Sequence, residues 1–356
     1  MKKHNFSAGP CILPPTVLKE ASEAVLNWNN SGLSLIEVSH RGKEFVAVMD
    51  EARQLVKDLL DVPANYEVLF LQGGASLGFY TTAMNFMKVN GKAAYYDTGT
   101  WSSKAIKEAK LVGEVEIIAS SKENGYKNIP APAAAPSDAD YVHYTTNNTI
   151  FGTQFNYVPE SNGTLVCDMS SDIFSRPIDV SKYDLIYAGA QKNMGPAGTV
   201  LYIVNKDKLG KSGRTIPAYL DLQVHIDKDS MFNTPPVFAI FTSMLTLRWL
   251  KSIGGVSAIE KINNEKARVM YQAIDENPLF VGYADKDSRS NMNATFKLVD
   301  DSLAPEFDKM WQEAGISGIK GHRSVGGYRA SMYNALTLES VQTLTEVMQK
   351  FATINA

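Results

Sequence analysis

The feature that most constrains this chain is the regular alternation of short apolar runs with helix-forming segments between residues 67 and 204. Seven runs have the length and composition of buried strands: 67–71, 93–97, 115–119, 141–145, 163–168, 185–188 and 199–204. Most of the segments between them are long enough to cross over the sheet, several of them as amphipathic helices. This pattern predicts an α/β fold with a mostly parallel seven-stranded sheet covered by helices.

Apolar residues at helical spacing predict helices elsewhere in the chain. The predicted helices are 15–28, 44–59, 77–87, 102–110, 236–252, 259–277, 305–314 and 338–354, with one further strand at 294–298. Beyond Gly254-Gly255, the predicted elements are three helices and one strand instead of regularly alternating strands and helices. We therefore predict an N-terminal arm (1–15), a large domain (16–254) and a smaller C-terminal α/β domain (255–356).

Composition excludes several classes of function. The chain has 35 Lys plus Arg against 38 Asp plus Glu, so it lacks the excess of positive charge that is typical of proteins that bind nucleic acid. No apolar run is long enough to span a membrane, and the first residues lack the apolar core of a secretory signal. The two cysteines and five scattered histidines form no zinc-binding spacing, so we expect no metal. We expect a soluble cytoplasmic protein.

Four of the predicted strand ends carry residues that are unusual for plain loops. Ligands of open parallel sheets bind beyond the carboxyl ends of the strands. A glycine turn, 72–78, follows the first strand and opens a helix, which is an arrangement that can bind phosphate. Asp168 ends one strand, Lys192 follows another closely, and Trp101 stands after a third. Each feature alone also fits an ordinary alternative: a tight turn, a helix cap, a surface charge or a packed ring.

Together, the four features are the parts needed to hold pyridoxal 5′-phosphate. A lysine buried among small residues has a lowered pKa and can bond to the cofactor's aldehyde. A carboxylate stabilises the protonated pyridine nitrogen, so that the ring can withdraw electrons. The glycine turn would bind the phosphate, and the indole would stack on the ring.

Two loops concentrate basic residues beside glycines. One is 320–329, which contains His322, Arg323 and Arg329, and the other is 39–42, which contains His40 and Arg41. Guanidinium groups suit carboxylates and phosphates because they can bind two oxygens at once. The ordinary alternative is a pair of solvated loops.

Five motifs make the chain similar to the phosphoserine aminotransferases from residue 6 to the C-terminus. They are FSAGP (6–10), SHRGK (39–43), YAGAQKNMGPAG (187–198), FNTPP (232–236) and GHRSVGGYRAS (321–331). The resemblance implies the aspartate-aminotransferase-like fold, fold type I of the enzymes that use pyridoxal phosphate. It also implies the class V aminotransferase group and a homodimer.

Carried over residue by residue, the resemblance implies a role for each matching position. Lys192 would be the catalytic residue that bonds to the cofactor. The cofactor site would comprise Ala75, Ser76, Trp101, Thr149, Asp168, Gln191, Lys192, Asn233 and Thr234. Asn233 and Thr234 would come from the partner subunit. The substrate's anionic groups would meet His40, Arg41, His322, Arg323 and Arg329. Many relatives have Arg or Cys where this chain has Ser76.

The implied reaction is the reversible transamination of 3-phosphohydroxypyruvate with L-glutamate, giving O-phospho-L-serine and 2-oxoglutarate. A phosphorylated four-carbon 2-oxo acid of pyridoxine synthesis is a further implied substrate. A cysteine desulfurase is an alternative on this fold, but it needs a cysteine in a late loop and none follows Cys167. An alanine–glyoxylate-type aminotransferase would need fewer basic residues. A cofactor-binding protein without catalysis is the alternative from another class.

Overall fold

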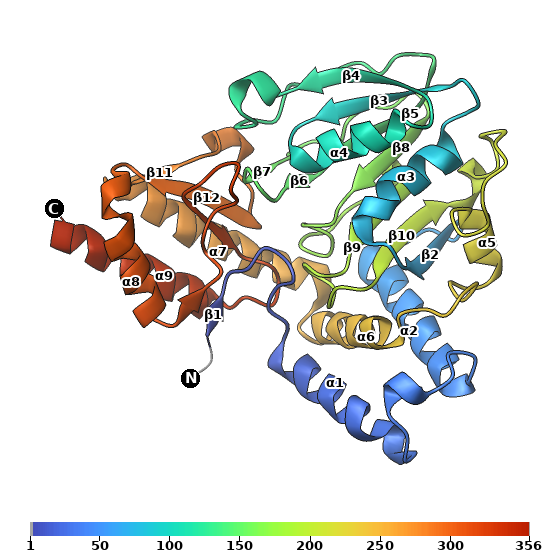
Figure 1. The fold of residues 1–356 in the computed structure, drawn as a ribbon, viewed down its shortest axis with the longest axis horizontal. Helices are drawn as coiled ribbons and strands as arrows, with labels where there is room; N and C mark the ends of the chain where they lie inside the picture. The colour runs from blue at the N-terminus through green and yellow to red at the C-terminus, as the bar shows by residue number, and fades with distance from the viewer. Residues whose placement is uncertain (1–2, 356) are drawn as a thin grey trace.

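A computed structural model describes residues 3–355 and contains a seven-stranded sheet with helices on both faces (Figure 1). The strand order is β2-β10-β9-β8-β5-β3-β4. In chain order the strands are β2 (Tyr66–Leu71), β3 (Lys92–Asp97), β4 (Glu114–Ser120), β5 (Ala139–Thr145), β8 (Thr164–Asp168), β9 (Leu185–Gly189) and β10 (Val200–Asn205). All seven predicted runs are therefore strands of one sheet, and the predicted fold class is confirmed.

Six of the seven strands run in the same direction. Only β10 is antiparallel to its neighbours, β2 and β9. The connection from β9 to β10 contains no helix, and a link without a crossover returns the chain antiparallel. The carboxyl ends of β2, β3, β8 and β9 consequently lie at one edge of the sheet.

Helices cover the two faces of the sheet separately. One apolar core joins the sheet to α1 (Pro15–Asn27), α2 (Lys43–Leu60) and α6 (Val237–Ser252). The core on the other face joins it to α3 (Gly74–Phe86), α4 (Thr100–Ala109) and α5 (Leu222–Asp227). Both α3 and α4 begin at the carboxyl edge, so their N-termini lie where strand-end residues gather.

The C-terminal third has a core of its own beside the large sheet (Figure 1). It comprises α7 (Gly255–Glu276), β11 (Phe280–Gly282), β12 (Asn293–Leu298), α8 (Ala304–Glu313), β14 (Tyr328–Ser331) and α9 (Leu338–Asn355). The N-terminal strand β1 (His4–Asn5) pairs with β13 (Ile316–Ser317), and Phe6 is buried in this same core. The domain boundaries near residues 15 and 254 stay predictions.

Within residues 3–355, no helix combines the length and the apolar character that crossing a membrane requires. Short elements make up the rest: β6 (Asn147–Asn148) pairs with β7 (Thr153–Gln154), and seven single-turn 3₁₀ helices lie in the described connections.

A fully buried lysine ties α7 to the segment that follows β14. Lys266 Nζ donates hydrogen bonds to the carbonyl oxygens of Met332 at 2.9 Å, Tyr333 at 2.9 Å and Leu336 at 3.0 Å. An ammonium group has three donors, so the three carbonyls match it completely. Without Lys266, these buried carbonyls would lose their side-chain donor.

We predict that Lys266→Met lowers the free energy of unfolding by on the order of 3 kcal/mol, because buried acceptors lose their donor. The matched control is Lys261→Met on the exposed side of the same helix, which should change the stability by less than about 0.5 kcal/mol. Urea unfolding followed by circular dichroism measures both. Equal stability of the two variants would show that the three carbonyls do not depend on Lys266.

Candidate active site

Four strand ends, two of which lead into helices, bring the predicted site residues together at the carboxyl edge of the sheet. Asp168 is the last residue of β8, and Lys192 lies in the turn after β9. Trp101 is in the first turn of α4, which follows β3, and α3 begins directly after β2. Parallel strands with a common carboxyl edge therefore explain why residues far apart in sequence converge.

The amine of Lys192 is buried and its pKa is low. Its Nζ donates a hydrogen bond to Thr149 Oγ1 at 2.8 Å and lies 5.7 Å from the centre of the Trp101 ring. Burial lowers the pKa of Lys192 to about 8, Asp168 raises it, and Arg329 lowers it further. With this pKa, roughly a tenth of the amine is unprotonated at pH 7, as a nucleophile or base must be.

The carboxylate of Asp168 is also buried, with 3% of the residue exposed. Its Oδ1 accepts a hydrogen bond from the N–H of Ser170 at 2.9 Å. Burial raises the pKa of Asp168, while the Ser170 hydrogen bonds and Lys192 lower it. A carboxylate in this position favours a cationic partner, because a cation offsets the cost of desolvating its charge.

The turn before α3 leaves backbone donors free for an anion. Gly73 has φ +91°, and a Cβ there would come within 2.4 Å of Leu77, so the turn requires glycine. No side chain caps α3, and the N–H groups in its first turn, which contains Ala75 and Ser76, have no partner within the helix. A helix N-terminus of this kind attracts phosphate through its donors and its dipole.

Arg329 connects the C-terminal third with the site. It stands on β14, and its Nη1 donates to the backbone oxygen of Thr149 at 3.2 Å. Its Nε is buried without a hydrogen-bond partner, and burial lowers the pKa of the guanidinium. Thr149 therefore contacts both Lys192 and Arg329, which places a cationic group beside the buried amine.

His322 and Arg323 lie in the loop before β14. His322 is half-buried, and its Nδ1 forms a hydrogen bond with Ser324 Oγ at 2.7 Å, whereas Arg323 is exposed. Burial, followed by Arg329 and Arg323, lowers the pKa of His322. The loop thus brings an imidazole with a lowered pKa and an exposed guanidinium close to Arg329.

Two predicted pairs stand apart from this cluster within one chain. Among the described residues, no hydrogen bond or ion pair links His40, Arg41, Asn233 or Thr234 to Lys192 or Arg329. His40 and Arg41 lie in the segment that directly precedes α2. Within one chain, the hydrogen bonds of the cluster therefore include neither pair.

The N-terminal segment is a part of the site that sequence reasoning missed. Cys11 Sγ donates to the backbone oxygen of Lys192, and Cys11 N–H donates to that of Gln191 at 3.1 Å. A Cβ on Gly9 would lie 3.5 Å from Lys192 Cγ. The motif at 6–10 was visible in the sequence, but nothing in it revealed that this segment covers the lysine.

These features fit pyridoxal phosphate. The uncapped start of α3 suits its phosphate, and the buried Asp168 suits a protonated ring nitrogen. Trp101 is partly buried and lies beside Lys192. Its Nε1 has no hydrogen-bond partner among the described residues and can donate to a ligand. Among the described residues, no cluster of His, Cys, Asp and Glu could hold a metal ion.

Comparison with known proteins gives one consistent result. The family model "Aminotransferase class-V" matches residues 3–344. A phosphoserine aminotransferase of Flavobacterium psychrophilum is 63% identical, covering 98% of this chain and 99% of that protein.

Solved structures agree with this result. The phosphoserine aminotransferase of Bacillus circulans subsp. alkalophilus superposes with a TM-score of 0.96 at 42% identity, covering 100% of this chain and 99% of that one. A PLP-bound phosphoserine aminotransferase from Trichomonas vaginalis has a TM-score of 0.90 at 37% identity, covering 98% and 100%. With a buried lysine, a strand-end carboxylate and an uncapped helix at the positions described above, the chain belongs to the phosphoserine aminotransferase family of the class-V aminotransferases.

Proposed function

We propose that this pyridoxal-phosphate enzyme transfers the amino group of L-glutamate to 3-phosphohydroxypyruvate, giving O-phospho-L-serine and 2-oxoglutarate. The observation that carries the proposal is the contact chain from Lys192 Nζ through Thr149 to Arg329. It places an amine that can move a proton beside a guanidinium that can bind a carboxylate. The family to which the chain belongs supports the same reaction.

In this proposal, the cofactor-binding residues act as the sequence predicts. Asp168 pairs with the ring nitrogen, and Trp101 lies against the ring. Thr149 contacts the ring's oxygen substituent. The free N–H groups at Ala75 and Ser76, together with the Gln191 side chain, bind the phosphate. Ser76 contributes a hydroxyl where many relatives have Arg or Cys.

Lys192 is the residue that bonds to the cofactor and moves the proton at the substrate's α-carbon. When bound, the cofactor withdraws electrons from this carbon, so that its proton becomes acidic. Lys192 must be neutral to accept the proton, and its pKa of about 8 leaves part of it neutral in the cell's pH range. The Thr149 hydroxyl, 2.8 Å from Nζ, keeps the amine in place between transfers.

Arg329 is the proposed partner of the α-carboxylate that both substrates share. His322 and Arg323 lie near it and suit the distal anion, which is a phosphate in one substrate and a carboxylate in the other. When the partner subunit supplies them, Arg41 adds positive charge and His40 adds a hydrogen-bonding imidazole to the same anion-binding region.

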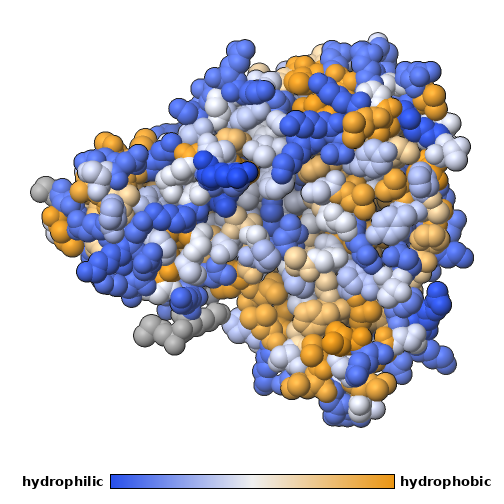
Figure 2. All heavy atoms as spheres, in the orientation of Figure 1, coloured by the Kyte–Doolittle hydropathy of each residue, from blue (hydrophilic) through white to orange (hydrophobic). Residues whose placement is uncertain are grey.

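We also propose a homodimer. Figure 2 shows hydrophobic residues gathered over the region of α1 and α6. Leu18 and Leu26 on α1 and Phe238 on α6 are exposed, the second of them by 81%. Exposed apolar patches of this kind mark interfaces. Asn233 and Thr234 lead directly into α6, so this surface would carry them toward the partner's cofactor.

The state of the cysteines supports a cytoplasmic location. Both cysteines are free, Cys11 half-buried and Cys167 buried, as is usual for proteins of reducing compartments.

The substrate is tested with a panel of 2-oxo acids and glutamate as the donor. We predict the highest kcat/KM for 3-phosphohydroxypyruvate, with pyruvate and glyoxylate at least about 100-fold lower, because they lack the distal anion and leave the basic groups unpaired. The phosphorylated four-carbon 2-oxo acid belongs in the panel. Lys192→Ala should abolish turnover with every acid. A preference for pyruvate or glyoxylate would contradict the proposed substrate.

A second prediction concerns Arg329. We expect Arg329→Gln to raise KM for glutamate and for 3-phosphohydroxypyruvate at least about tenfold, because both lose a charge-assisted hydrogen bond to the α-carboxylate. The control is Arg268→Gln, on an exposed surface of α7, which should leave both constants unchanged. Steady-state kinetics measures the effect. Raised KM for only one of the two substrates would contradict the assignment of Arg329 to the α-carboxylate that both share.

A further inference from the structure

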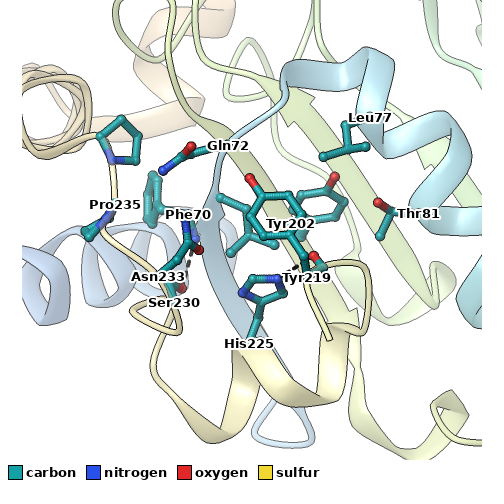
Figure 3. A pocket seen from close by; sticks show the side chains of 12 residues that line it. Phe70, Gln72, Leu77, Thr81, Tyr202, Tyr219, His225, Ser230, Asn233 and Pro235 are labelled. Carbon is teal, nitrogen blue, oxygen red and sulfur yellow. Dashed lines mark hydrogen bonds between the residues drawn. The ribbon is translucent and has the colours of Figure 1, made fainter. Parts of the chain in front are cut away.

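Gln72 connects two parts of the chain that serve different cofactors in the proposed dimer. It is the first residue after β2 and directly precedes the glycine turn that opens α3. Its Nε2 donates a hydrogen bond to the backbone oxygen of Thr234 at 2.6 Å. Figure 3 shows Gln72 beside Pro235, with Leu77 of the neighbouring α3 on the other side of the pocket.

The segment that carries Asn233 and Thr234 has few other anchors. Ser230 Oγ accepts a hydrogen bond from the N–H of Phe70 on β2 at 3.1 Å. Ser230 itself has a left-handed φ of +66°. Two of the described side chains donate a hydrogen bond to the backbone oxygen of Thr234. They are Gln72, at 2.6 Å, and the adjacent Asn233, at 3.5 Å. Gln72 therefore provides the side-chain hydrogen bond that ties the Thr234 backbone to the end of β2.

Residues on both sides of Thr234 make this tie effective. Pro235 is buried, and Pro235-Pro236 restricts the backbone that leads into α6. The small cavity beneath the segment encloses about 10 Å³, roughly the space for one water. The hydrogen bond at Thr234 therefore restrains a segment that Pro235-Pro236 stiffens on one side and Ser230 fixes on the other.

We propose that Gln72 is a positioning residue that holds the Asn233–Thr234 segment where it contacts the partner subunit's cofactor. Gln72 thus acts on the cofactor of the other protomer, although it adjoins the turn that binds its own. The inference rests on the proposed function, in which Asn233 and Thr234 reach across the dimer.

Mixed dimers separate an effect on the partner's site from an effect on the chain's own site. In each dimer, one chain carries Lys192→Ala, so that the visible absorbance of lysine-bound cofactor reports only the site of the other chain. Two different affinity tags allow the mixed species to be purified. The cofactor is removed, and pyridoxal phosphate is titrated back while this absorbance is recorded.

We expect Gln72→Met to weaken cofactor binding only across the dimer. When Gln72→Met and Lys192→Ala are in the same chain, the Kd at the wild-type partner's site should rise about threefold to tenfold, as the loss of one hydrogen bond would cause. When Gln72→Met is in the chain with the intact Lys192, the Kd should stay within about twofold of the Lys192→Ala/wild-type dimer. The opposite pattern, or equal changes in both dimers, would overturn the proposal.

A control variant and a third dimer complete the experiment. Gln54→Met, on an exposed part of α2, should leave the Kd unchanged in both arrangements, and urea unfolding of the Gln72→Met homodimer checks that it is folded. Asn233→Ala in the Lys192→Ala chain tests the proposed reach across the dimer. If Asn233→Ala weakens binding in the partner and Gln72→Met does not, the positioning role is wrong and the proposed function stands. If neither does, the reach itself is wrong.

Discussion

The burial of one amine is the constraint on which the rest of this site depends. Removing the Lys192 ammonium from water disfavours its charge, and this brings the pKa down to about 8. Such burial requires a crowded turn, which Ala190 and Met194 provide from the same segment, each fully buried. It also requires a cover, and the N-terminal segment at Gly9 and Cys11 supplies it. The chemistry of the lysine is thus a product of packing.

Charge in this molecule matters through its position. The chain as a whole carries a net charge of −3, yet the carboxyl edge of the sheet holds Lys192, Arg329 and the free N–H groups of α3. Asp168 is the compensating charge at this edge, and it raises the pKa of Lys192 while Arg329 lowers it. Because Arg329 comes from β14, the C-terminal third contributes directly to the electrostatics of the large sheet.

The sequence predicted the sheet well because its strands are locally encoded. Each strand contains an apolar run between turn residues, so all seven were found, including the largely exposed edge strand β4, as were Asp168 and Lys192 near the ends of two others. The short strands β11 and β14 and the six-residue helix α5 were missed, because elements this short depend on tertiary contacts more than on local pattern.

The long-range contacts at the site were the part that the sequence predicted least. The contact of Cys11 with Lys192 spans 181 residues, and that of Gln72 with Thr234 spans 162. A side chain that donates to a backbone carbonyl requires no particular residue at the accepting position, so the sequence carries no paired signal for it. The predicted roles of Asn233 and Thr234 depend on a second chain, whose position a single sequence does not give.

The pKa of Lys192 in the cofactor-free protein tests this account most directly. Competitive acylation of amines over a pH series, with the reaction at each lysine quantified by mass spectrometry, gives the pKa of Lys192. We predict half-maximal reactivity of Lys192 near pH 8, well below the ordinary lysine value of about 10.4. A pKa of Lys192 near that ordinary value would show that its amine is solvated, and would contradict the view that burial sets its chemistry.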